Sequence, residues 1–98
     1  MSGTSVEKMS ESEIKSALED LPKWNEVGGE LQRTIQFDDF VASMVFVNRV
    51  ADAAESDAHH PDILIRYNKV TLTLSTHDAG GITGKDFRLA STIDDMVG

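Results

Sequence analysis

The stretch ILIRYNKVTLTLST, residues 63–76, decides the fold of this chain. In its second half apolar residues alternate with hydroxyl-bearing ones, Val70, Leu72 and Leu74 against Thr71, Thr73 and Ser75. This alternation is typical of a strand with one buried and one polar face. The first half, Ile63–Tyr67, predicts a second strand, and residues 68–69 predict the turn between them. The stretch therefore predicts an antiparallel hairpin.

A second hairpin is expected earlier in the chain. Trp24 and Val27 precede the pair Gly28-Gly29, and an alternating run through Phe37 follows it. Two adjacent glycines favour a tight turn between antiparallel strands. The first strand of this pair is weakly marked.

Three helices are predicted around the hairpins. Ser10 and Glu13 form a capping box before an apolar repeat (Ile14, Leu18, Leu21) that Pro22 ends. Asp38 and Asp39 precede a long helix with apolar positions at Phe40, Val41, Met44, Val47, Val50, Ala51 and Ala54, of which Phe40, Met44 and Val47 are assigned to the core. After a break at Gly80-Gly81, Thr83 and Asp86 resemble a capping box before a last helix with Phe87, Leu89, Ala90, Ile93 and Val97.

The predicted order is therefore α-ββ-α-ββ-α. It corresponds to an α+β fold, a four-stranded antiparallel sheet with helices packed on one face. At 98 residues the chain fits one domain, residues 1–98.

Composition excludes several classes of function. The net charge of −8 argues against nucleic-acid binding, which depends on Lys and Arg at phosphates. The chain has no cysteine, which excludes disulfides, thiolate metal sites and a thiol nucleophile. Residues 1–10 are polar, and no segment approaches the length of an apolar membrane span, so we expect a cytoplasmic protein.

All three histidines lie between residues 59 and 77. His59 and His60 follow the long helix, whereas His77 ends a predicted strand, so folding can bring them together. Strand phase places His77 on the polar side, and the pocket is expected at the strand's end or on that polar face. Imidazole exchanges protons near neutral pH, so the cluster predicts an acid–base site.

Each of these residues also has a purely structural interpretation. A histidine pair before Pro61 fits a polar turn, because proline restricts the preceding residue to extended geometry. Asp86 fits a helix cap as well as a site residue. Glu55 could orient an imidazole or simply be a solvated acid at a helix end. Three histidines and a carboxylate could also bind Zn²⁺.

The motifs together resemble the pterin-4a-carbinolamine dehydratase family. The resemblance rests on ESDAHHP at residues 55–61, YNKV at 67–70, LSTH at 74–77, and GIT with Asp86 at 81–86. It implies the same α+β fold and an enzyme that dehydrates 4a-hydroxytetrahydropterin to quinonoid dihydropterin, recycling tetrahydrobiopterin after an aromatic amino-acid hydroxylase. No metal or other cofactor is implied, since the pterin is the substrate.

The resemblance also implies roles for individual residues. His59 and His77 are the candidate acids, and His60 is a candidate for substrate binding and base catalysis. Glu55, Thr76 and Asp86 are candidates for substrate binding. Ala58 departs from the family, because relatives often carry an acid before the histidine pair; Asp57 could replace it in part.

Two further properties follow from the resemblance. Self-association as a homodimer or homotetramer is expected, and the edges of an open sheet would favour it. The alternative to catalysis is a non-catalytic partner protein, because animal members dimerise a homeodomain transcription factor and some bacterial members assist phenylalanine hydroxylase expression.

Overall fold

The computed structural model describes residues 7–97; part of the polar N-terminus predicted above, residues 1–6, and Gly98 lie outside the described residues. The elements are α1 (Glu11–Leu18), β1 (Asn25–Val27), β2 (Glu30–Gln36), α2 (Phe40–Asp57), β3 (Asp62–Arg66), β4 (Lys69–Leu74), the short 3₁₀ helix η1 (His77–Ala79) and α3 (Gly84–Val97). The predicted α+β fold and element order are confirmed, with η1 as an addition.

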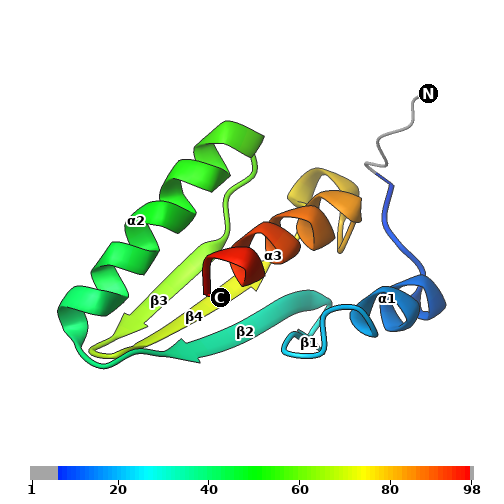
Figure 1. The fold of residues 1–98 in the computed structure, drawn as a ribbon. Coiled ribbons are helices and arrows are strands. Elements are labelled where there is room, and N and C mark those ends of the chain that lie inside the picture. The colour runs from blue at the N-terminus through cyan, green and yellow to red at the C-terminus, as the bar shows by residue number, and fades with distance from the viewer. Residues whose placement is uncertain (1–6, 98) are drawn as a thin grey trace.

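The sheet has the strand order β1-β2-β4-β3, and every neighbouring pair is antiparallel. Strand β4 therefore lies inside the sheet, where Val70, Leu72 and Leu74 are fully buried. Helices α2 and α3 lie over the same face of the sheet, and α1 lies near the β1 end (Figure 1). The apolar face predicted from the alternation is the face that these helices cover.

The two hairpin turns differ in how well they were predicted. The β1–β2 turn is at Gly28 and Gly29, which both have positive φ, as the glycine pair indicated. The β3–β4 turn is at residues 67–68, one residue earlier than predicted, because Lys69 already pairs with Arg66. Asn68 is held outside the strands by two bonds to Phe37: the Phe37 N–H donates to its carbonyl, and its amide donates to the Phe37 carbonyl.

Helix α2 corrects part of the predicted core. Phe40, which was assigned to the core, is 47% exposed, so that assignment was wrong; the apolar positions Val41, 69% exposed, and Ala51 also face solvent. The buried positions are Ser43, Phe46, Val50 and Ala54, while Met44 and Val47 are half-buried. The buried Ser43 hydroxyl donates to the Asp39 carbonyl at 3.0 Å, which satisfies its hydrogen-bonding capacity. Because a polar residue occupies a buried position, the apolar residues alone do not mark the buried face of α2.

The N-termini of α1 and α2 follow the predicted capping, whereas α1 ends at Leu18 instead of continuing through Leu21 to Pro22. The Ser10 hydroxyl accepts from the Glu13 N–H, and the Glu13 carboxylate accepts from the Ser10 N–H, as a capping box requires. Asp39 alone caps α2, by accepting from the Ala42 N–H at 2.9 Å. In residues 7–97 no helix has both the length and the apolar character needed to cross a membrane.

Candidate functional site

A left-handed turn at the end of α2 sets the direction of the histidine pair. Ala58 caps the helix with φ of 53°, and the His59 N–H then donates to the Ala54 carbonyl at 3.1 Å. This backbone pattern is a common way to end a helix and reverse the chain. It places His59 next to α3 and leaves His60 beside the last turns of α2.

His59 is paired with a buried carboxylate. Its Nε2 lies 2.5 Å from Asp86 Oδ1, and the side chains are 11% and 0% exposed. Because an ionised carboxylate only accepts hydrogen bonds, this contact places a proton on Nε2. Nδ1 is then the ring nitrogen left to exchange a proton with a bound molecule.

A chain of hydrogen bonds ends at the other oxygen of Asp86. The Lys85 N–H donates to the Thr83 hydroxyl at 3.2 Å, and the Thr83 and Thr76 hydroxyls lie 2.8 Å apart. The Thr76 hydroxyl and the Thr83 N–H each donate to Asp86 Oδ2 at 2.9 Å. Asp86 therefore caps α3 with Oδ2 and holds His59 with Oδ1, so both interpretations of this residue apply.

His60 makes a similar contact in a different environment. Its Nε2 lies 2.5 Å from Glu55 Oε2, but the two side chains are 61% and 77% exposed. Solvent competes for both groups, so this contact constrains His60 less than Asp86 constrains His59.

His77 lies just beyond the sheet rather than on its polar face. Strand β4 ends at Leu74, Thr76 forms an isolated bridge with Gly81, and His77 begins η1. The predicted strand phase therefore does not extend to His77. Of the two expected positions for the pocket, the structure has the one at the strand's end.

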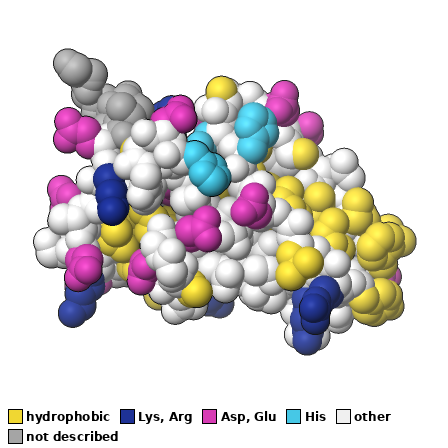
Figure 2. Space-filling view, turned by 180° about the vertical axis from the view of Figure 1, so that it is seen from behind, with side chains coloured by type: hydrophobic (Ala, Val, Ile, Leu, Met, Phe, Trp, Pro, Cys, Tyr) yellow, Lys and Arg dark blue, Asp and Glu magenta, His cyan; other side chains and the backbone are white. Residues whose placement is uncertain are grey.

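All three histidines line one open pocket of about 280 Å³. Its other lining residues are Ala58, Thr76, Asp78 and Lys85, whereas Glu55 and Asp86 do not line it. Figure 2 shows the histidines close together on the surface, away from the hydrophobic side chains at one end of the molecule. Sequence reasoning missed Asp78 and Lys85, although each is adjacent to a candidate, His77 and Asp86 respectively.

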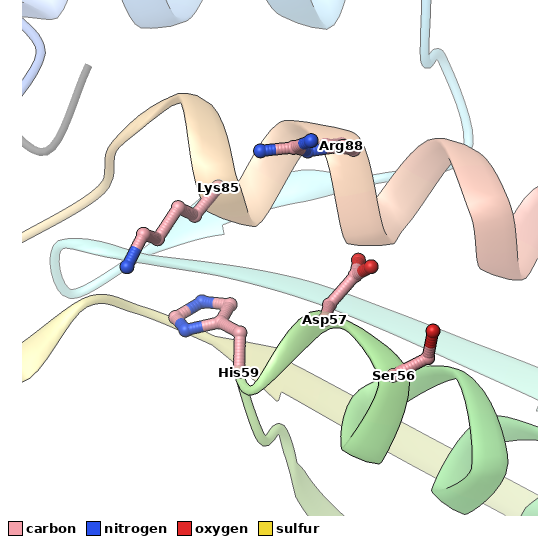
Figure 3. Close-up of a pocket in the computed structure, with 5 residues that line it drawn as sticks. All are labelled: Ser56, Asp57, His59, Lys85 and Arg88. Carbon is pink, nitrogen blue, oxygen red and sulfur yellow. The ribbon is translucent and has the colours of Figure 1, made fainter. Parts of the chain in front are cut away.

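His59 also lines a second pocket of about 210 Å³. The remaining lining residues are Ser56 and Asp57 from the end of α2, and Lys85 and Arg88 from α3. In Figure 3 the Lys85 side chain extends toward the His59 ring, and the Asp57 carboxylate points toward α3.

The arrangement of the histidines does not resemble a metal centre. His59 and His60 contact different carboxylates, and across residues 7–97 no group of three or more His, Asp or Glu side chains is arranged to hold a metal ion. The Zn²⁺ alternative therefore gains no support from the ligand geometry.

The fold and the site together define a small α+β protein with a histidine pocket at the junction of α2, β4 and α3. The family model for pterin 4 alpha carbinolamine dehydratase matches residues 7–96, and the chain belongs to this family.

Two relatives that are about half identical to this chain carry the same family name. A protein of Nocardia farcinica is 51% identical over 92 residues, which cover 94% of this chain and 97% of that one. A protein of a Cyanothece strain is 52% identical over 88 residues, with 90% and 91% covered. Both are named "Putative pterin-4-alpha-carbinolamine dehydratase".

Solved structures agree with this fold. The crystal structure of a transcriptional coactivator/pterin dehydratase from Brucella melitensis superposes with a TM-score of 0.89 at 33% identity, covering 93% of this chain and 99% of that one. A pterin dehydratase-like protein described as a RuBisCO assembly factor in the alpha-carboxysome has a TM-score of 0.67 at 23% identity over 78% of this chain and 90% of its own. The second likeness concerns the fold alone.

Proposed function

We propose that this chain dehydrates 4a-hydroxytetrahydropterin to quinonoid dihydropterin and water. The observation that carries the proposal is the pocket lined by all three histidines of the chain. In the reaction the C4a–O bond breaks as the hydroxyl takes up a proton, N5 loses its proton, and a C4a=N5 double bond forms. Groups that both donate and accept protons near neutral pH are what this exchange needs.

The proposed roles follow from the family resemblance and the geometry. His59 and His77 act as acids on the two faces of the pterin, with His59 presenting Nδ1 because Asp86 occupies Nε2. His60 binds the ring and accepts the N5 proton. Because Asp86 is fully buried, we assign it to positioning His59 rather than to direct contact with substrate.

Thr76 and Glu55 support the same site in different ways. Thr76 lines the histidine pocket, and its hydroxyl donates to the buried Asp86 carboxylate. Thr76 therefore connects the proposed substrate pocket to Asp86. Glu55 orients His60 from the solvent side. No cofactor is proposed, because the pterin itself is the reactant and imidazoles supply the proton transfers.

The metabolic setting and assembly are further proposals from the family resemblance. We propose a cytoplasmic enzyme that recycles tetrahydropterin behind an aromatic amino-acid hydroxylase. Self-association as a dimer or tetramer is supported by the exposed apolar residues at the end of the molecule formed by α2 and the β3–β4 turn: Phe40, Val41, Val45, Leu64 and Tyr67.

A non-catalytic partner function is the second candidate, which the same surface would serve. Light scattering of wild type and Val41→Glu tests the assembly.

His77→Ala tests the proposed chemistry. His77 is exposed and makes no side-chain hydrogen bond within residues 7–97, so its removal should leave folding intact. The expected result is a loss of about 10²-fold or more in the dehydration rate. Asn48→Ala, at an exposed position of α2, is the control and should keep the wild-type rate. An unchanged rate in His77→Ala would remove this histidine from the mechanism.

A further inference from the structure

The second pocket that His59 lines has a cationic rim. Lys85 and Arg88 are three residues apart on α3 and therefore lie on one face of the helix, facing Ser56 and Asp57 at the end of α2. Figure 3 shows these side chains gathered around one opening beside the His59 ring. None of the roles proposed above uses Arg88 or this pocket.

The two cations have no side-chain partner among the residues that the structure describes. Within residues 7–97, neither the Lys85 ammonium nor the Arg88 guanidinium forms an ion pair or a side-chain hydrogen bond. Asp57, the one acid lining the pocket, also forms no ion pair with them. With Lys85 and Arg88 against Asp57, the rim carries one excess positive charge in a chain of net charge −8.

This pocket adjoins the histidine pocket directly. His59 and Lys85 line both of them. A molecule whose ring lies among the histidines could therefore extend a substituent past Lys85 to Arg88. The second pocket is the smaller of the two, about 210 Å³ against 280 Å³, which suits a compact group better than another ring system.

We infer that this pocket is a subsite for an anionic side chain on the substrate, a phosphate monoester on the C6 substituent of the pterin. The inference rests on the proposed dehydratase function and adds its substrate class. Arg88 forms the paired hydrogen bonds that a guanidinium makes with phosphate oxygens, and Lys85 adds a second positive charge. Ser56 supplies a hydroxyl donor on the α2 side.

Global charge makes the test more discriminating. Because the whole chain is acidic, a phosphate ester is repelled from most of its surface, and long-range attraction does not favour an anionic substrate. A preference for the ester would therefore report local contacts. We expect the two cations to raise kcat/KM for the ester about fivefold over kcat/KM for the alcohol. An exposed ion pair contributes up to about 1 kcal/mol, and 1.4 kcal/mol corresponds to a tenfold change.

The experiment compares two 4a-hydroxytetrahydropterins that differ only in the end of the C6 side chain, a hydroxyl or its phosphate monoester. The measured quantity is the ratio of kcat/KM for the ester to that for the alcohol. We expect a ratio of about five in wild type. In Arg88→Gln the ratio should fall toward one, while Arg49→Gln, at an exposed position of α2 outside both pockets, should keep the wild-type ratio. Lys85 is not varied because it also lines the histidine pocket.

The outcomes separate this inference from the proposed function. If both substrates are dehydrated equally well, the dehydratase function stands and the anionic subsite is overturned. If the ester is preferred but the ratio survives in Arg88→Gln, the assignment to this pocket is overturned. If neither substrate reacts faster than it does spontaneously, the proposed function fails and the subsite with it. If inorganic phosphate speeds the alcohol reaction and the ester has no advantage, the pocket binds a free anion, which contradicts the inference.

Discussion

The adjacent residues His59 and His60 each contact a carboxylate at the same distance, but the two contacts have opposite environments. His59 and Asp86 are 2.5 Å apart with exposures of 11% and 0%, whereas His60 and Glu55 are also 2.5 Å apart with exposures of 61% and 77%. The buried contact is backed by three further hydrogen bonds that join Asp86 to Thr76 and Thr83 or join the two threonines to each other. Distance alone therefore does not rank the strength of such contacts, whereas burial and the supporting hydrogen bonds do.

Asp86→Asn should have the largest effect, because it alters the buried contact. The amide has a single accepting oxygen and puts a donating NH2 group in place of the other, so a buried donor loses its partner at a cost of about 2 kcal/mol in unfolding free energy. The dehydration rate should fall by about 10²-fold, because His59 loses the carboxylate that holds its Nε2. Urea unfolding and the dehydration rate measure the two effects. A stability loss with an unchanged rate would mean that Asp86 acts only as a helix cap.

Ala58→Gly should come next, by releasing strain at the turn that separates the two contacts. Ala58 has φ of 53°, a conformation that costs a residue with a β-carbon about 1 kcal/mol and glycine almost nothing. Unfolding free energy should rise by up to about 1 kcal/mol. The matched control is Ala51→Gly, in the exposed interior of α2, which should lower it by about 1 kcal/mol. Destabilisation of equal size in both variants would mean that the turn is not strained.

Glu55→Gln should have a smaller effect than either, because it alters the exposed contact. An exposed ion pair contributes between 0 and about 1 kcal/mol, so we expect a stability change below about 0.5 kcal/mol and a rate loss below about fivefold. Parallel rate measurements on Glu55→Gln and Asp86→Asn make the comparison directly. Equal losses of dehydration rate in the two variants would mean that burial does not determine which histidine–carboxylate contact matters.

Glu13→Gln should have the smallest effect on stability, and this effect should depend on pH because it removes an exposed carboxylate. The Ser10 backbone N–H and, after it, the Ser10 side chain hold the pKa of Glu13 below its usual value of 4.5. The cap therefore adds stability above the unfolded-state pKa, and this contribution is lost as pH falls through the lower folded-state pKa. The urea midpoint of Glu13→Gln should lie slightly below that of wild type at pH 7 and converge with it in acid. A constant difference across this range would contradict the capping assignment.

The fold was largely predictable because its signals are local. The β4 alternation, the Gly28-Gly29 turn and the caps at Ser10 and Asp39 each involve residues within a few positions of one another. The errors occurred where distant contacts decide the outcome. Asn68 is fixed by bonds to Phe37, which shift the second turn. Ser43 is a buried polar residue, so the apolar pattern of α2 misled the core assignment.

The site was predictable as a list of residues but not as an arrangement. Motif spacing identified His59, His60 and His77, while the pairing of His59 with Asp86 spans 27 positions and depends on the left-handed turn at Ala58. Nothing local marks Ala58 for that conformation. Lys85 and Arg88 were missed for the same reason, since only the packing of α3 beside the end of α2 makes them line a pocket.

The most direct test of the account is the rate at which purified protein in metal-free buffer removes chemically generated 4a-hydroxytetrahydropterin. We predict a rate well above the spontaneous one in wild type and a fall of about 10²-fold in His59→Ala, with the fold retained by circular dichroism. No acceleration by folded wild-type protein, or an equal rate in His59→Ala, would contradict it.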